Sequence, residues 1–147
     1  MNDTNEEKVR RFLRGLHDPL RPDLTDAMKD FAEDASYQSL VPSRAPIVGK
    51  STIQGELEQQ FERYTDCNCE ILAIASSDQF VFTERRDHVT MKKWNKRIFS
   101  SVNAVFELNE GGHIISWREY WDTGDIAAQL DLSPEEMKKL HAPEASN

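Results

Sequence analysis

The chain has 147 residues, 38% of them hydrophobic, and a formal net charge of −8, which suits one globular domain with a single core. The acidic balance argues against nucleic acid or an acidic membrane surface as a partner, because both require a basic patch. No apolar stretch reaches transmembrane length and the N-terminus is polar, so we expect no signal peptide and a cytoplasmic protein.

A capping-box pattern opens the first predicted helix. Thr4 is followed three places later by Glu7, and apolar residues then recur at helical spacing. This pattern predicts a helix from about Asn5 to Leu16. The prolines that follow His17 end it.

Two more helices and a strand are predicted before residue 62. Asp23 or Thr25 can cap a short helix that continues through Met28 and Phe31, and Ser51 can cap a longer one. Between these helices we expect a strand over residues 34–41 and a loop over residues 42–49. The strand places Ala35, Tyr37 and Ser39 on one face. For Tyr37, packing of the ring in the core and contact with a ligand both stay open.

From Asp66 onward the pattern changes to strands joined by short turns. The predicted strands cover residues 69–75, 80–91, 98–108 and 113–121. Residues 122–125 are expected to close the sheet, and brief helices follow near Ile126 and from Ser133.

Helices followed by antiparallel strands indicate an α+β domain. A strongly curved, mainly antiparallel sheet wrapped around helices forms a cone with an apolar interior. We therefore expect one cone-shaped α+β domain over residues 1–141 and a disordered tail over residues 142–147.

The cysteines and histidines show no metal-binding pattern. Cys67 and Cys69 lie two apart in a predicted strand and are expected to face opposite sides. Two thiols are too few for a metal site. The four histidines show no ligand spacing either, so the sequence predicts no metal.

The strand over residues 80–91 carries charges among apolar residues. Strand alternation places Arg85 and Asp87 on one face, in line with Val81 and Val89. If this face is buried, the guanidinium and the carboxylate need each other or a third group, because an isolated buried ion is costly. The opposite register would bury still more charge and is disfavoured.

The last predicted strand can supply the third group. Alternation places Trp117, Glu119 and Trp121 on one face, so an acid lies between two tryptophans. Desolvation raises the pKa of such a carboxyl and an arginine opposes the shift. Two carboxyls around one arginine would titrate as a unit, with one able to hold a proton while the other stays ionised. This arrangement can perform acid and base catalysis at one site.

The two segments Thr83–Asp87 and Gly112–Asp122 resemble the limonene-1,2-epoxide hydrolase family, and the similar order of helices and strands extends from about Val9 to Leu132. That family belongs to a superfamily of cone-shaped α+β domains, the nuclear transport factor two-like proteins, which includes SnoaL-type polyketide cyclases and ketosteroid isomerases. The resemblance implies this fold and an epoxide-opening activity.

The resemblance also implies roles for individual residues. Arg85, Asp87 and Glu119 correspond to the Asp-Arg-Asp triad of the family, with Glu119 as general base on water and Asp87 as the acid that protonates the epoxide oxygen. Arg85 would keep their pKa values apart. Tyr37 and Ser39 correspond to the tyrosine and asparagine that help to hold the water. Since water attacks directly, neither a covalent intermediate nor a cofactor is implied.

Two departures from the family pattern keep other functions open. Glu119 stands where the family has aspartate, and Ser39 where it has asparagine. The first hypothesis is a hydrolase that opens an epoxide on a small apolar molecule. The second is an isomerase, cyclase or lyase that uses the same groups for proton transfer on a terpenoid, polyketide or aromatic substrate. The third is a non-catalytic protein that binds a hydrophobic ligand.

Apolar residues on the lines that lead to the triad are candidates for the substrate-binding walls, with core packing as the alternative. They are Val89, Trp117, Trp121 and Ile126. Their aromatic bulk suggests a flat or cyclic apolar substrate. Related domains commonly pair through the outer face of the sheet, so the resemblance implies a homodimer.

Overall fold

The computed structural model describes residues 4–17, 23–42 and 44–141. The helices are α1 (Asn5–Leu16), α2 (Leu24–Ala27), α3 (Lys50–Phe61), α4 (Thr123–Gln129) and α5 (Pro134–His141). The strands are β1 (Phe31–Gln38), β2 (Ile47–Val48), β3 (Tyr64–Ser77), β4 (Phe80–Met91), β5 (Lys96–Leu108) and β6 (Ile114–Trp121). The expected tail over residues 142–147 lies outside the described residues.

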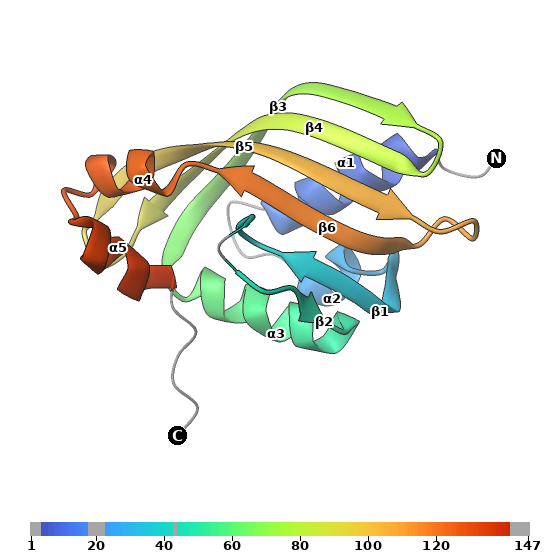
Figure 1. Ribbon diagram of the computed structural model, residues 1–147, viewed down its shortest axis with the longest axis horizontal. Helices are drawn as coiled ribbons and strands as arrows, with labels where there is room; N and C mark the ends of the chain where they lie inside the picture. The colour runs from blue at the N-terminus through green and yellow to red at the C-terminus, as the bar shows by residue number, and fades with distance from the viewer. Residues whose placement is uncertain (1–3, 18–22, 43, 142–147) are drawn as a thin grey trace.

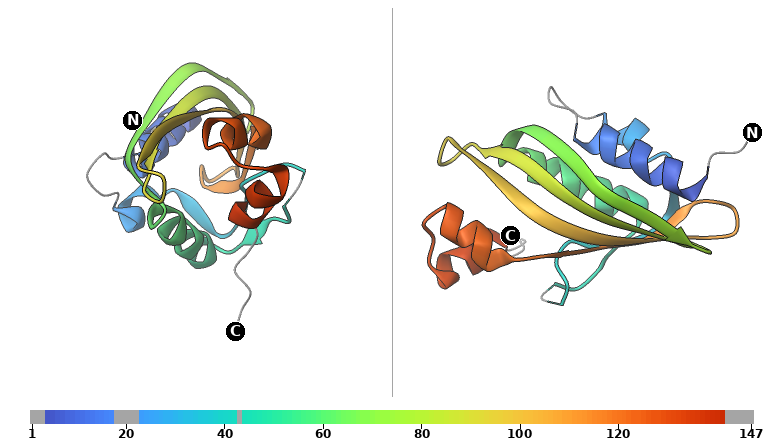
Figure 2. Two further views of the ribbon diagram at one scale, coloured as in Figure 1. Left: turned by 90° about the vertical axis from the view of Figure 1, so that its left-hand side faces the viewer. Right: turned by 90° about the horizontal axis from the view of Figure 1, so that it is seen from above.

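The strands form one curved sheet in the order β2-β1-β6-β5-β4-β3. All neighbours are antiparallel except β1 and β6, which run parallel. The sheet curls around α1, α2 and α3 without closing, and α4 and α5 lie at one end (Figures 1 and 2). The predicted α+β cone with a mainly antiparallel sheet is confirmed.

The first helix begins and ends where the sequence predicts. The Thr4 hydroxyl accepts from the backbone N–H of Glu7 at 3.2 Å, and the Glu7 carboxylate accepts from the backbone N–H of Thr4 at 2.7 Å. Its apolar face buries Phe12, whose ring packs edge-on against Phe31 and Trp117. The capping box therefore fixes the start of a helix that fills the concave side of the sheet.

Several boundaries differ from the sequence prediction, including those of β1, which ends at Gln38, and of β3, which covers Tyr64–Ser77. Phe31 opens β1 instead of ending α2, and residues 47–48 form the short strand β2 inside the expected loop. Gly49 is the N-cap of α3 with φ +106°, a conformation that favours glycine. Ser51 therefore lies inside the helix. Residues 123–125 belong to α4, because the Asp122 side chain caps it by accepting from the backbone N–H of Gly124 at 2.8 Å.

The predicted register of the two charged strands is correct. Arg85 is 1% exposed and Glu119 8% exposed, whereas Tyr120, the next residue along, is 41% exposed. On β5, directly between them, the inward residues are Val102 and Ala104. Because these side chains are small, groups on β4 and β6 can meet across β5.

The core has two parts on either side of a hollow. The larger cluster packs α1, α2 and α3 against the sheet and includes Phe12, Phe106 and Trp117. The smaller cluster gathers Met91 and Ile126 with residues of α5. Among the described residues, no helix is long and apolar enough to cross a membrane.

Candidate active site

Arg85 lies at the centre of the charged cluster. Its Nε donates to Oδ1 and Oδ2 of Asp87 at 3.0 and 3.2 Å, and its Nη2 donates to Oδ2 at 3.0 Å. The same Nη2 donates to Oε2 of Glu119 across β5. One buried guanidinium therefore joins two carboxylates that come from different strands, as the sequence predicted.

Trp117 and Arg85 both hold Glu119 through its Oε2 atom. Trp117 Nε1 donates to Oε2 at 3.1 Å, and Trp117 itself is fixed by stacking on Tyr37 at a ring distance of 3.9 Å. Among the described residues no donor is placed on Oε1. Since Glu119 also lines the pocket, Oε1 is the oxygen that can accept a proton from water.

The two carboxyls differ in proton affinity. Burial works to raise the pKa of Asp87, but the charge of Arg85 and then the hydrogen bond and charge of His17 outweigh it, so the pKa lies well below its usual range. For Glu119 burial prevails over Arg85, and the charge of Asp87 adds to it, so the pKa is raised. Asp87 therefore stays ionised, while Glu119 takes up a proton more readily.

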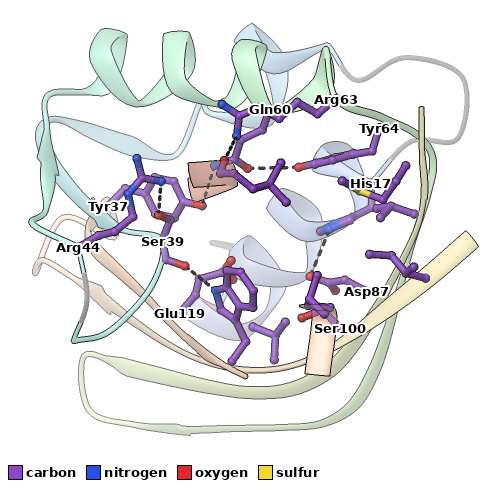
Figure 3. A pocket seen from close by; sticks show the side chains of 17 residues that line it. His17, Tyr37, Ser39, Arg44, Gln60, Arg63, Tyr64, Asp87, Ser100 and Glu119 are labelled. Carbon is purple, nitrogen blue, oxygen red and sulfur yellow. Dashed lines mark hydrogen bonds and ion pairs between the residues drawn. The ribbon is translucent and has the colours of Figure 1, made fainter. Parts of the chain in front are cut away.

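A pocket of about 170 Å³ opens onto these carboxyls (Figure 3). The apolar side chains among its lining residues are Val89, Met91, Ile98, Val102, Trp121, Ile126 and Leu140. Three of the four predicted wall residues, Val89, Trp121 and Ile126, thus line it. Trp117 stacks against Tyr37, is 1% exposed and does not line this pocket. It borders a smaller cavity of about 50 Å³ beside Arg85.

Hydroxyl groups from β1 and the segment after it face the same pocket. Tyr37 Oη accepts from Gln60 Nε2 at 3.4 Å, and Gln60 Oε1 accepts from Tyr64 Oη at 3.2 Å. Ser39 Oγ accepts from Arg44 at 3.4 Å. Tyr37 and Ser39 each keep a hydroxyl proton that can be donated to a water molecule. Burial, and next the charge of Glu119, raise the pKa of Tyr37, so this phenol remains protonated.

Sequence reasoning missed His17 and Cys69, both next to Asp87. His17 Nε2 lies 3.6 Å from Asp87 Oδ2, and Cys69 pairs directly opposite Asp87 on the neighbouring strand. The expectation that Cys67 and Cys69 face opposite sides is wrong, because residues two apart on a strand share a face. Cys67 is 2% exposed, and burial and then the charge of Asp87 raise its pKa to about 11.

His17, Cys69 and Asp87 offer three possible metal ligands within 4.8 Å of one another, a nitrogen, sulfur and oxygen set of the kind that zinc accepts. Two features oppose a metal there. Both Asp87 oxygens already accept N–H groups of Arg85. Burial, and next the charge of Asp87, raise the pKa of Cys69 to about 12, whereas a metal needs the thiolate.

The depressed pKa of Asp87 predicts a pH-dependent loss of stability in Asp87→Asn. A carboxyl whose pKa is lower in the folded chain stabilises the fold above about pH 4 and loses this effect as the pH falls toward the folded pKa. We expect the variant to be less stable by roughly 1–3 kcal/mol at pH 7, and by less at pH 3. Urea unfolding at both pH values measures this, with Asp34→Asn as the exposed control. An equal difference at both pH values would refute the shift.

The chain is similar to known proteins in sequence and in fold. The sequence model of the limonene-1,2-epoxide hydrolase catalytic domain matches residues 3–131. An LEH-like epoxide hydrolase from M. tuberculosis is similar at a TM-score of 0.70 and 25% identity, over 86% of this chain and 90% of that one.

Two more distant structures share the fold. One is a ketosteroid isomerase-like protein from Catenulispora acidiphila, solved with trimethylamine (TM-score 0.77, 17% identity, covering 90% of this chain and 98% of that chain). The other is SalBIII, an epoxide hydrolase/cyclase-like enzyme of pyran ring formation in salinomycin (TM-score 0.71, 18% identity, covering 82% and 92%).

Proposed function

The chain belongs to the limonene-1,2-epoxide hydrolase family, and we propose that it adds water to an epoxide on a small apolar or cyclic molecule without a cofactor. The observation that carries this proposal is the buried Arg85 that joins Asp87 and Glu119, two carboxyls that both line a mainly apolar pocket. Two carboxyls with divergent pKa values in one hollow are suited to acid and base roles.

Glu119 is the general base. Its raised pKa brings its proton affinity closer to neutral pH, where a base is most effective. The attacking water is held by the Tyr37 and Ser39 hydroxyls and gives its proton to Oε1 as its oxygen bonds to an epoxide carbon. Arg85 and Trp117 hold Oε2 and so keep the carboxyl in one orientation.

Asp87 lies on the acid side of the reaction. As the epoxide C–O bond breaks, the leaving oxygen receives a proton by way of the Asp87 carboxyl, which is ionised at rest and therefore passes on a proton from a neighbouring donor. Arg85 stabilises the ionised carboxylate that remains, because its Nε and Nη2 donate to both oxygens. Water attacks carbon directly, so the product diol forms without a covalent intermediate.

The pocket favours a small substrate without charge. Its volume of about 170 Å³ and its apolar lining suit a compact ring or short hydrocarbon. Tyr64 and Gln60 add polar atoms on the side of α3 (Figure 3). The substrate is therefore expected to place its epoxide at the carboxyls and its hydrocarbon part against Val89, Trp121 and Ile126.

A panel of terpene and aryl epoxides assayed in isotopically labelled water tests the proposal. Conversion to a diol that carries label is the expected result. A rearranged or cyclised product without label would instead establish the second candidate, an isomerase, cyclase or lyase, which the departures at Ser39 and Glu119 favour. If no epoxide is converted but apolar ligands raise the melting temperature, the third hypothesis, a non-catalytic protein that binds a hydrophobic ligand, would be supported instead.

Restoring the family pattern tests whether the two departures compensate. Glu119→Asp withdraws the carboxyl by one methylene, and an error near 1 Å can cost about a hundredfold in rate. We expect Glu119→Asp alone to lower kcat by roughly 10- to 100-fold, and the double variant with Ser39→Asn to recover part of the loss. Steady-state kinetics of the four proteins in the cycle measure the coupling. Additive effects would show that the two positions act independently.

We also propose that two copies pair through the outer face of the sheet. Three aromatic side chains are exposed there, Phe82, Phe99 and Tyr120, each more than 40% accessible. Their positions on β4, β5 and β6 form one face, because Phe99 pairs with the outward His88 and Tyr120 with Asn103. Sedimentation of the purified protein distinguishes a dimer from a monomer.

A further inference from the structure

His17 is fixed at the C-terminal end of α1 and points toward the acid side of the site (Figure 3). Its backbone N–H donates to the carbonyl oxygen of Leu13 at 3.1 Å, and its ring Nδ1 lies 2.8 Å from the same oxygen. Its other ring nitrogen, Nε2, lies 3.6 Å from Oδ2 of Asp87. The imidazole is therefore held at both edges, and its side chain is 10% exposed.

These contacts require a proton between His17 and Asp87. A carbonyl oxygen can only accept, so Nδ1 carries a hydrogen. Nε2 then faces the carboxylate with either a hydrogen or a lone pair. A lone pair directed at an ionised carboxylate in a buried site is unfavourable, so the proton is either on Nε2 or on the carboxyl of Asp87.

The charges of the cluster lead to the same conclusion. Arg85 supplies one positive charge for two buried carboxyls, so two ionised carboxylates leave an excess negative charge. A protonated His17 balances it, and the C-terminal end of a helix favours a cation. His17 in fact acts to lower the pKa of both Asp87 and Glu119. A cation beside the pair thus favours the ionised form of both carboxyls, while burial still holds the pKa of Glu119 above its usual range.

We propose that the proton delivered to the epoxide oxygen is held between Nε2 of His17 and Oδ2 of Asp87, and that His17 is a positioning residue acting through Asp87. This rests on the proposed function. In the step, water gives one proton to Glu119 as its oxygen bonds to carbon. The epoxide C–O bond breaks, and its oxygen takes the proton shared by Asp87 and His17. The proton on Glu119 then returns to His17 through pocket water, which restores the resting charges.

Other groups that can titrate lie near this pair on four strands of the sheet, whereas β5 places the uncharged Ser100 opposite Asp87. They are Cys69 and Tyr64 on β3, Arg85 on β4, Glu119 on β6 and Tyr37 on β1. Burial raises the pKa of Cys69, Tyr64 and Tyr37, and the two carboxylates hold that of Arg85 up despite burial. Among the described residues that face the pair, the thiol, the two phenols and the guanidinium therefore keep their protons near neutral pH.

His17→Gln tests the proposal, because an amide can donate to Asp87 but cannot supply a proton. We expect kcat/KM at pH 7 to fall roughly 10²-fold. The alkaline limb of the pH profile should also move to lower pH, since Asp87 alone holds its proton only in acid. A profile that is merely scaled down, with its alkaline limb in place, would mean a structural role only. His88→Gln, on the outer face of the same strand as Asp87, is the control and should keep the wild-type profile.

A second measurement needs neither turnover nor a variant that folds. Nitrogen NMR of the wild-type histidines at pH 7 shows, for each ring nitrogen, whether it carries a proton, accepts a hydrogen bond or has a bare lone pair. We expect both nitrogens of His17 to carry a proton or accept a hydrogen bond. A bare lone pair on Nε2 would overturn the proposal. If no epoxide is opened, the proposed function fails, while this spectrum still decides where the proton lies.

Discussion

Glu119→Gln is expected to lower the kcat of epoxide opening by roughly 10³-fold, which is within the usual contribution of a general base. Glutamine fills the same space and can still accept from Arg85 and Trp117, but it cannot take a proton from water. Discontinuous assays of diol formation measure the decrease in kcat. The fold should be retained, because burial disfavours the ionised form of Glu119 and the neutral amide of glutamine avoids that cost.

The control for this variant is Glu84→Gln, an exposed carboxylate on the outer face of β4. It should leave kcat unchanged. If Glu119→Gln keeps more than a tenth of wild-type activity while Asp87→Asn loses all of it, the base and acid have been assigned to the wrong carboxyls.

Arg85→Met is expected to have the largest effect on stability, roughly 3–5 kcal/mol at pH 7, because it leaves two buried carboxyls without their shared cation. Methionine replaces the length of the side chain but none of its donors. The carboxyls must then become protonated, so part of the loss should be recovered near pH 4. Urea unfolding at the two pH values measures this, and activity should be undetectable.

Arg86→Met is the matched control on the same strand. The Arg86 guanidinium lies over the exposed ring of Phe99 at 5.5 Å, a contact worth about 0.5–1 kcal/mol at an exposed site. A loss in Arg85→Met that is no larger than the loss in Arg86→Met would contradict the buried charge cluster.

The sequence alone was sufficient to predict which face of the two triad-bearing strands is buried, because apolar and charged residues alternate along each strand. Either face of β4 carries charge, and the face with Arg85 and Asp87 also carries Val81, which is fully buried. The alternation of Trp117, Glu119 and Trp121 on β6 worked in the same way. Period-two patterns of this kind fix a register wherever one face is buried.

His17 could not be predicted, because its role depends on where the end of one helix meets a strand 70 residues further on. Nothing in the local sequence says that the end of α1 lies against β4. Cys69 was missed for a different reason, since its inward direction follows from strand alternation and was assigned incorrectly. The sequence signal for Cys69 was therefore present, whereas the one for His17 was not.

The position of Trp117 shows the limit of assigning pocket walls from a shared face. It points inward on the same face as Trp121, yet Tyr37 stacks over it and separates it from the main pocket. How deeply an inward side chain is buried in the cone depends on which helix or strand packs over it. Alternation gives the face of a residue but not its depth.

The most direct test of direct water attack is a single turnover in water enriched in the heavy oxygen isotope, with enzyme in excess over an epoxide that it converts. If Glu119 activates water and no covalent intermediate forms, every diol molecule of this first turnover carries one heavy oxygen. A first-turnover diol without label would mean that its oxygen came from a carboxyl of the protein, and would contradict the roles given to Glu119, Arg85 and Asp87.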